Sequence, residues 1–275
     1  MKILLTGYKG FIGQNMFQYL CDNTDWEIDT YEWGEEYHGV LGYDWVIHLG
    51  AISSTTEKDI DKILEQNTEF SSKLFDDCKT FGVNLQYASS ASVYGKNTEF
   101  TELSPVDPIT PYAWSKYLFE RYATNNQGGN IVQGFRYFNV YGEFEDHKGN
   151  QASPVHQFVK QAKETKKIKL FDESERFYRD FICVDDVCRV HVEFIEKVID
   201  SGIWNLGTGH PTSFEKVAEY VIKRYDGKMK YIMMPKELER SYQKYTCSDN
   251  SKLENTLGKQ EWIRIKDFLR ATYKD

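Results

Sequence analysis

Apolar runs and amphipathic stretches alternate along most of the chain. The runs KILLT, EIDTY, DWVIHLG, NLQYASS and IVQGFRYF have the β-branched and aromatic character of strands. Helical patterns lie between them, over about 11–20 and 60–81 and again after Pro111. Apolar strands that alternate with helices predict a parallel sheet covered on both faces. We therefore expect an α/β fold built on a Rossmann-type, doubly wound parallel sheet.

The alternation of strands and helices is interrupted by one short link and becomes less regular in the second half of the chain. Only about ten residues separate YEW from the next strand, too few for a helix and a strand, so the sheet should be shorter by about one βα unit. From about residue 141 onwards the pattern is less regular and richer in aromatic and charged residues. We expect a Rossmann domain at 1–140, with about 180–207 returning to it. A smaller C-terminal α/β lobe for substrate binding should comprise 141–179 and 208–275.

The composition argues against several classes of function. The chain has 275 residues, a net charge of −8 and a pI of about 5.4, so a basic nucleic-acid surface is not expected. The five cysteines are scattered without a CxxC pair, which argues against a disulfide framework or a metal site. No apolar run is long enough for a bilayer, and the chain begins directly with a strand pattern. We expect a soluble, cytoplasmic protein without a membrane partner.

A glycine-rich turn follows the first predicted strand. Gly7, Gly10 and Gly13 stand in GxxGxxG spacing at the start of a predicted helix. The first glycine permits a tight turn, the second lets the backbone approach a pyrophosphate, and the third allows close packing of helix on sheet. The helix N-terminus adds partial positive charge. This position predicts a dinucleotide-binding loop.

Two charged residues bear on which dinucleotide would bind. Glu32 ends the second strand, where an acidic residue would hold the adenosine ribose hydroxyls of NAD. Lys9 lies within the glycine loop, where its amine could reach the 2′-phosphate of NADP. Both residues could equally be ordinary surface charges. NAD and NADP therefore both stay open, with NADP favoured, and no metal ion is expected.

A serine, a tyrosine and a lysine form a candidate catalytic set. Tyr112 and Lys116 are four residues apart at the start of a predicted helix, so both project from one face. A tyrosine, with a reference pKa of about 10, is a poor base unless a neighbouring ammonium stabilises the tyrosinate. The hydroxyl of Ser90, at the end of a predicted strand, could donate to an oxygen that becomes a carbonyl. The set predicts oxidation and reduction of a carbinol.

With these motifs the chain resembles the extended short-chain dehydrogenase/reductase family. The matching segments are TGYKGFIG, VIHLGA, YASSASVYG, PYAWSK, GFRYFNVYG, RDFICVDDV and WNLGTG. The resemblance implies NAD(P)-dependent chemistry on a nucleotide-activated sugar, with Ser90, Tyr112 and Lys116 as the catalytic triad, in a homo-oligomer. The cofactor-binding residues that we expect are Gly7, Lys9, Gly10, Phe11, Ile12, Gly13, Glu32, Leu49, Gly50, Ala51, Asn67, Tyr112, Lys116 and Val140.

Three segments narrow the resemblance to one group within this family. SSTTEKD, FNVYGEFEDHKGNQAS and YQKYT are similar to segments of the ADP-glycero-manno-heptose 6-epimerases. This implies that Lys148 is a second acid/base, on the side of the sugar opposite Tyr112. Inversion through a ketone returns hydride to the other face, which makes a second amine useful. The implied substrate contacts are Ser53, Ser54, Thr55, Ser90, Asn139, Asn150, Gln157, Phe171, Asp172, Glu173, Ser174, Arg179 and Tyr242.

Departures from the group keep other activities open. GEFEDHKG replaces the Pro-Arg that usually follows FNVYG, so another nucleotide-sugar 4-epimerase or a ketoreductase would also fit. A 4,6-dehydratase is disfavoured, because the Asp-Glu pair that such enzymes carry beside the serine is absent. A non-catalytic, dinucleotide-sensing Rossmann protein would explain the shortened sheet but would not need the triad. We expect a nucleotide-sugar epimerase, and at the family level a product that enters a surface polysaccharide such as lipopolysaccharide.

Overall fold

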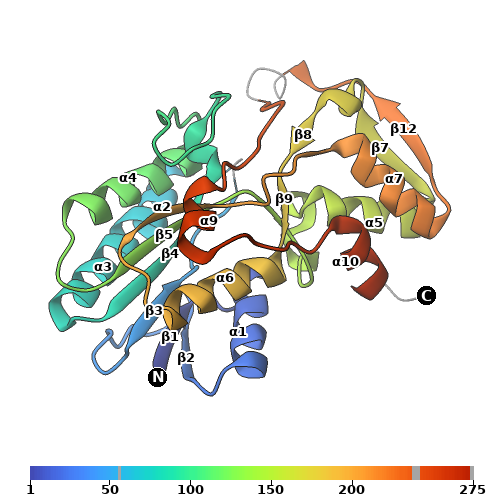
Figure 1. Ribbon diagram of the computed structural model, residues 1–275. Helices are drawn as coiled ribbons and strands as arrows, with labels where there is room; N and C mark the ends of the chain where they lie inside the picture. The colour runs from blue at the N-terminus through green and yellow to red at the C-terminus, as the bar shows by residue number, and fades with distance from the viewer. Residues whose placement is uncertain (55–56, 237–241, 273–275) are drawn as a thin grey trace. The chain divides into compact units, whose positions relative to one another are not determined.

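The computed structural model describes residues 1–54, 57–236 and 242–272, which form two compact units (Figure 1). Unit 1 comprises residues 1–97, 102–137 and 188–205, and unit 2 comprises residues 98–101, 138–187 and 206–275. The first domain expected from the sequence ended at residue 140. The observed division comes at 137, because residues 139–141 pair with a strand of unit 2. Of the expected returning segment, 188–205 lies in unit 1.

Unit 1 is built on a six-stranded sheet with the strand order β10-β5-β4-β3-β1-β2. The four pairs from β2 to β5 are parallel, and every residue of β3 and β5 is buried, as the apolar runs predicted. The predicted α/β fold with a parallel sheet is thereby confirmed. The strands are β1 (Lys2–Thr6), β2 (Glu27–Tyr31), β3 (Trp45–His48), β4 (Asn84–Ser90), β5 (Val132–Tyr137) and β10 (Gly202–Leu206).

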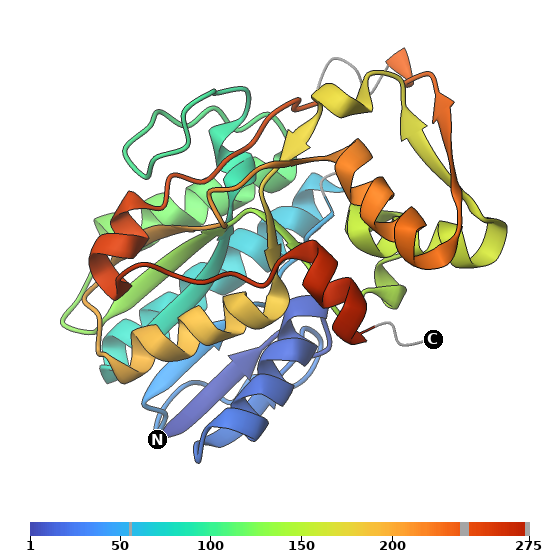
Figure 2. The same ribbon diagram turned by 45° about the vertical axis from the view of Figure 1, so that its right-hand side comes forward.

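Helices cover both faces of this sheet. Helices α1 (Phe11–Asn23) and α6 (Val184–Glu196) lie on one face, and α3 (Phe70–Phe81) and α4 (Pro111–Asn125) on the other (Figure 2). Aromatic side chains fill the contacts on each side. On the α6 face, Phe194 packs edge-on against Phe135 of β5, and on the other face Phe119 of α4 packs edge-on against Tyr87 of β4. Such aromatic pairs stabilise the layers beyond the apolar area that they bury.

The link between β2 and β3 contains neither helix nor strand. Residues 32–44 form turns and irregular structure. The sheet therefore lacks a βα unit at this point, as the short spacing in the sequence predicted, and β2 is its edge strand.

The helix expected over residues 60–81 is divided by a π-turn. Helix α2 (Ile60–Leu64) runs into the π-turn η1 (Glu65–Glu69), which continues as α3. Asn67 lies in this turn with its side chain buried. Its amide accepts a hydrogen bond from the Ile52 N–H at 2.7 Å and donates to the Ile52 carbonyl and to Ser115 Oγ, each at 3.0 Å. The π-turn thus joins the segment after β3 to α4, and such turns often occur at functional sites.

The described residues of unit 2 form three small sheets and a core of their own. β6 (Asn139–Tyr141) and β9 (Phe181–Cys183) pair in parallel, as do β7 (Lys167–Phe171) and β12 (Lys228–Ile232), while β8 (Tyr178–Arg179) and β11 (Thr212–Ser213) are antiparallel. Its helices are α5 (Pro154–Thr165), α7 (Phe214–Tyr225), α9 (Ser251–Leu257) and α10 (Ile265–Thr272), and its 3₁₀ turns are η3 (Asp146–Gln151) and η4 (Ser174–Arg176).

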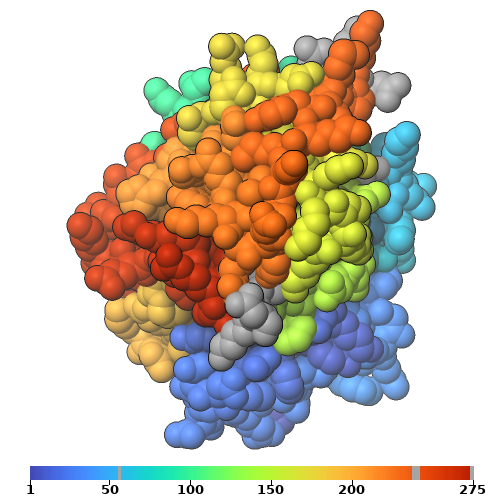
Figure 3. Space-filling model, turned by 90° about the vertical axis from the view of Figure 1, so that its right-hand side faces the viewer, coloured from blue at the N-terminus to red at the C-terminus, as the bar shows by residue number. Residues whose placement is uncertain are grey.

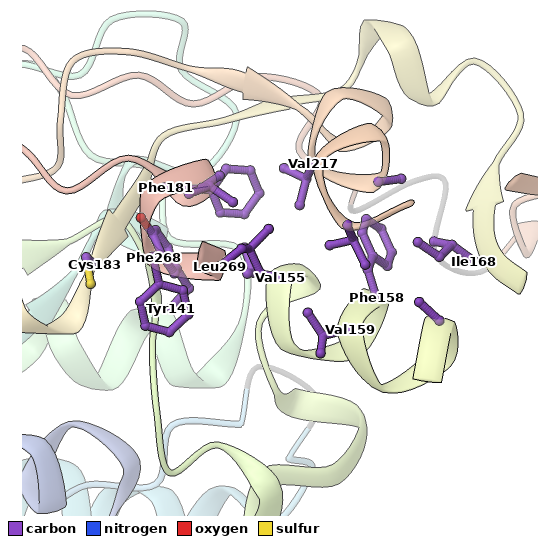
Figure 4. Packing of buried hydrophobic residues seen from close by; sticks show 14 of the residues in the cluster. Tyr141, Val155, Phe158, Val159, Ile168, Phe181, Cys183, Val217, Phe268 and Leu269 are labelled. Carbon is purple, nitrogen blue, oxygen red and sulfur yellow. The ribbon is translucent and has the colours of Figure 1, made fainter. Parts of the chain in front are cut away.

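The core of unit 2 lies between α5, α7 and α10. Figure 4 shows Val155 and Phe158 of α5 pointing into the same cluster as Val217 of α7 and Phe268 of α10. At the surface of the unit α5 and α7 lie side by side (Figure 3). None of the helices in the described part of the chain is long and apolar enough to cross a membrane.

Candidate active site

The predicted glycine loop joins β1 to α1 and leaves no room for side chains at two of its glycines. Gly7 has a φ of +75°, and a Cβ atom there would lie 2.4 Å from the backbone nitrogen of Gly50. A Cβ atom on Gly13 would lie 1.9 Å from the carbonyl oxygen of Gly7. Helix α1 begins after Gly10 without a side-chain cap. The loop therefore presents a close-packed helix N-terminus, which is the geometry that holds a pyrophosphate.

Two carboxylates lie beside this loop. Glu32 Oε2 accepts a hydrogen bond from the backbone N–H of Lys9 at 3.0 Å. The Lys9 side chain pairs with Glu35 instead, with Nζ 2.8 Å from Oε1. This pairing raises the pKa of Lys9 and lowers the pKa of Glu35. The amine that favoured NADP on sequence grounds is thus matched by a carboxylate, and Glu35 is a residue that the sequence analysis did not single out.

A pocket of about 60 Å³ opens at this end of the sheet in unit 1. Its walls include Gly7, Glu32, Gly50 and Ala51, all predicted cofactor residues. The aromatic rings of Tyr31, Trp33 and Phe70 complete it, and they were not predicted. Tyr31 and Phe70 stack with ring centroids 5.3 Å apart. A polar floor with flat apolar walls suits the adenosine part of a dinucleotide.

A buried histidine holds the floor of this pocket in place. His48 Nδ1 lies 2.6 Å from Thr6 Oγ1, and His48 Nε2 lies 2.8 Å from Ser71 Oγ. The backbone N–H of Gly50 donates to the same threonine oxygen at 3.3 Å. Burial lowers the pKa of His48 to about 3, so the imidazole stays neutral at physiological pH. The network joins β1, β3 and α3 where the predicted Leu49–Ala51 segment begins.

Ser90, Tyr112 and Lys116 come together at the carboxyl end of β4, as the sequence predicted. Helix α4 begins at Pro111, capped by Thr110, whose Oγ1 accepts from the Ala113 N–H at 3.1 Å. Tyr112 and Lys116 are both buried on the face of α4 toward β4. The Lys116 amine donates to the Ala88 carbonyl oxygen at 3.0 Å, and the Ser90 and Tyr112 side chains hydrogen-bond with each other.

Burial has opposite effects on the pKa values of these two groups. It raises the pKa of Tyr112, an effect that the hydrogen bond with Ser90 opposes. It lowers the pKa of Lys116 to about 8, an effect that the charge of Glu120 opposes. Tyr112 is therefore a neutral phenol near neutral pH and is able to donate a proton. Lys116, with a pKa of about 8, changes its charge within one pH unit of that pH. A positive charge beside the tyrosine would stabilise its anionic form.

Lys148 lies in unit 2, in the turn η3, and is not an ordinary solvated lysine. Burial lowers its pKa, and the nearby Glu145 opposes that shift. Glu145 is itself fully buried and accepts hydrogen bonds from the Gly142 N–H and from both the N–H and the hydroxyl of Ser153. One carboxylate thus ties together both ends of the loop that carries Lys148.

Other predicted substrate residues also lie in unit 2. The Arg179 guanidinium lies over the rings of Phe214 and Tyr242, 5.4 and 5.2 Å from their centroids, and donates to the Tyr178 carbonyl. Burial lowers the pKa of Arg179. Phe171 meets Tyr242 edge-on at 6.0 Å. These contacts place Arg179, Phe171 and Tyr242 together.

The remaining predictions have varied surroundings. The Gln157 amide donates to the carbonyls of Asn150 and Ala152, so it already has partners within the loop. Ser53 is exposed, Ser54 half-buried, and Thr55 lies outside the described residues. Asn139 and Val140 are in β6, and Phe11 and Ile12 begin α1. Asp172 and Glu173 connect β7 to η4, which begins at Ser174. No three His, Cys, Asp or Glu side chains gather as a metal site within the described ranges.

Comparison with known proteins agrees with this geometry. Residues 3–207 match the model of a family described as the NAD dependent epimerase/dehydratase family. An ADP-L-glycero-D-manno-heptose-6-epimerase from Brachyspira hyodysenteriae is 40% identical over 215 residues, which cover 76% of this chain and 68% of that protein.

Solved structures show the same fold. The crystal structure of an ADP-L-glycero-D-manno-heptose-6-epimerase from Helicobacter pylori superimposes with a TM-score of 0.86 at 23% identity, covering 98% of this chain and 94% of that one. A UDP-N-acetylglucosamine 4-epimerase from Methanobrevibacter ruminantium gives a TM-score of 0.85 at 21% identity over 98% and 97% of the two chains. From the glycine loop, the catalytic set and the family match together, the chain belongs to the NAD dependent epimerase/dehydratase family.

Proposed function

We propose that this protein is a nucleotide-sugar epimerase that inverts carbon 6 of an ADP-glycero-manno-heptose by transient oxidation. The observation that carries the proposal is the set of Ser90, Tyr112 and Lys116 at the end of β4, in which Ser90 is half-buried and the other two side chains are buried. The 40% identical relative named for this activity supports the choice of sugar. The fold alone would fit many other activities.

Each member of the set has a role in the proposed reaction. A bound oxidised nicotinamide dinucleotide supplies the chemistry of hydride transfer from and to the sugar. Tyr112 exchanges the proton of the sugar oxygen in one orientation of the substrate, taking it from the carbinol or returning it to the ketone. Ser90 donates a hydrogen bond to that oxygen, and Lys116 stabilises the tyrosinate. Hydride and proton both leave and return, so the reaction has no net oxidation.

The pair of Lys9 and Glu35 points to NAD rather than NADP. Two carboxylates, Glu32 and Glu35, lie where a 2′-phosphate would add negative charge, and the Lys9 amine is already paired. We expect the wild-type protein to bind NAD at least tenfold more tightly than NADP, because the 2′-phosphate of NADP would bring negative charge beside two carboxylates. Glu35→Gln should narrow this ratio, because it frees the Lys9 amine.

Dinucleotide affinities measured by fluorescence titration would check this expectation. Glu36→Gln is the matched control, because Glu36 is a nearby exposed carboxylate without contact to Lys9. Tighter binding of NADP than of NAD by the wild-type protein would contradict the proposal. Mass spectrometry of dinucleotide released from the denatured protein gives an independent answer.

Lys148 is proposed as the second acid/base of the reaction. Lys148 is half-buried, and its lowered pKa suits proton transfer near neutral pH better than that of a solvated amine would. We expect Lys148→Met to lower the epimerisation rate by about a hundredfold or more, the usual contribution of a positioned acid or base. Dinucleotide affinity and melting temperature should stay unchanged.

Lys160→Met is the control for this variant, since Lys160 is an exposed lysine of α5. Single-turnover absorbance of the reduced nicotinamide would follow oxidation of the sugar separately from its reduction. If Lys148→Met turns over as fast as the control, Lys148 has no part in the chemistry.

The substrate is tested by incubating the protein with a panel of nucleotide-sugars and following stereochemistry by NMR. Inversion at carbon 6 of the ADP-heptose is the expected result. Inversion at carbon 4 of a hexose would identify a 4-epimerase instead. Conversion that consumes added reduced dinucleotide would identify a ketoreductase, and binding of dinucleotide without any turnover would identify a sensor.

A further inference from the structure

Helix α4 contacts the end of β4 through a third residue beyond the proposed catalytic pair. Tyr112, Lys116 and Glu120 follow one another at intervals of four residues, so they lie on one face of the helix. Each of them hydrogen-bonds with a different one of the last three residues of β4: Tyr112 with Ser90, Lys116 with Ala88 and Glu120 with Ser89. For Glu120 the contact is the Ser89 hydroxyl, which donates to Oε1 at 2.5 Å. The helix is therefore registered on the strand at three successive turns.

Glu120 is held from the neighbouring strand as well. Arg136 of β5 donates from Nε to Glu120 Oε1 at 2.9 Å and from Nη2 to Oε2 at 2.7 Å, a bidentate pair. Arg136 Nη1 donates to the Tyr94 hydroxyl at 3.0 Å, and that hydroxyl donates to Asn205 Oδ1 at 2.7 Å. Glu120 is 1% exposed and Arg136 is 5% exposed.

A buried ion pair of this kind needs a reason other than stability. Two charges removed from water cost several kcal/mol, and apolar replacements of both partners are often as stable. The pair lies one helical turn from Lys116, which is buried too. The fixed negative charge of Glu120, one helical turn away, favours the charged form of Lys116.

We infer that Glu120 is a positioning residue of the proposed reaction, which Arg136 and Ser89 hold so that Lys116 stays charged and fixed beside Tyr112. The inference rests on the proposed function, in which Lys116 stabilises the tyrosinate. It assigns a role to a carboxylate that touches neither sugar nor dinucleotide.

Among the described groups around Lys116, Glu120 is the one that favours the charged form of the lysine. In the described part of the chain, the titratable groups around the two residues are His48 of β3, Tyr87 of β4, Tyr94 of η2 (Ala91–Tyr94), Arg136 of β5 and Tyr112 itself. His48 is neutral and burial raises the pKa of Tyr87 well above 10. Glu120 raises the pKa of Lys116, against the lowering by burial.

The test compares Glu120→Gln with the paired variant Glu120→Leu/Arg136→Met. In protein labelled with ¹³C-lysine, the Lys116 titration measured by NMR should move about one pH unit lower in Glu120→Gln, which loses the negative charge, and by a smaller amount in the paired variant, which also loses the positive charge of Arg136. The alkaline limb of the kcat profile should move with it, so that kcat is reduced about twofold at pH 7 and about tenfold at pH 9, with KM within about threefold.

The melting temperatures of the two variants distinguish a positioning role of Glu120 from a contribution to stability. Glu120→Gln should lower it, because Arg136 loses its anionic partner, and the paired variant should recover it. Glu193→Gln, at an ion-paired carboxylate of α6, should move neither the titration nor the kcat profile. Unshifted titrations in both variants, whatever the melting temperatures, would overturn the inference. A wild-type protein that turns over no nucleotide-sugar would overturn the proposed function, while the Lys116 titration would still decide the role of Glu120.

Discussion

Tyr112→Phe is expected to lower kcat by about a thousandfold, within the range that a positioned acid or base contributes. The variant removes only the hydroxyl that, in the proposed reaction, exchanges the proton with the sugar. The ring of Tyr112 keeps its buried place on α4, so the fold and the dinucleotide affinity should be retained. Steady-state kinetics on the ADP-heptose, together with dinucleotide titration, would measure both effects.

A second tyrosine of the same helix provides the control. Tyr117 is half-buried and packs beside Trp114, with ring centroids 6.0 Å apart. Tyr117→Phe should leave kcat within about twofold of the wild type, because its hydroxyl touches no reacting group. A loss of less than tenfold in Tyr112→Phe would show that another group carries the proton.

Gly13→Ala is expected to abolish dinucleotide binding and to reduce the free energy of unfolding by about 3 kcal/mol, the upper part of the range for overpacking. The new methyl group would lie 1.9 Å from the carbonyl oxygen of Gly7, so the helix must move away from the loop. That movement takes the α1 N-terminus out of reach of a pyrophosphate. Urea unfolding and fluorescence titration with the dinucleotide would measure the two losses.

Gly129→Ala is the matched substitution for this experiment. A Cβ atom at Gly129 would meet nothing within 4 Å, and its φ is not in the left-handed region. Its stability should stay within about 0.5 kcal/mol of the wild type. Retention of tight dinucleotide binding by Gly13→Ala would mean that the loop has more freedom than its packing indicates.

Local spacing explains what could be predicted from the sequence. The glycine loop, and the placing of Tyr112 and Lys116 on one helix face, depend on residues a few positions apart. The shortened sheet followed from a gap of about ten residues, because a chain segment that short cannot form a βα unit. Periodicity and chain length carry such information directly.

Contacts between distant residues could not be predicted in the same way. The Lys9 amine pairs with Glu35, 26 positions away, and the proposed preference for NAD depends on this partner. The Asn67 amide depends on a π-turn, which changes the helical register by one residue where the sequence shows an unbroken helical pattern. In both cases tertiary packing determines which of several chemically equivalent residues becomes the hydrogen-bond partner.

The interleaving of the two units limits how this protein could have changed during evolution. The chain passes from one unit to the other at residues 97, 101, 137, 187 and 205, so neither unit is a continuous stretch of gene. A single recombination event therefore cannot exchange the unit that carries Lys148 for the corresponding unit of a relative. New specificity has to arise by substitutions within a chain that keeps both units folded at every step.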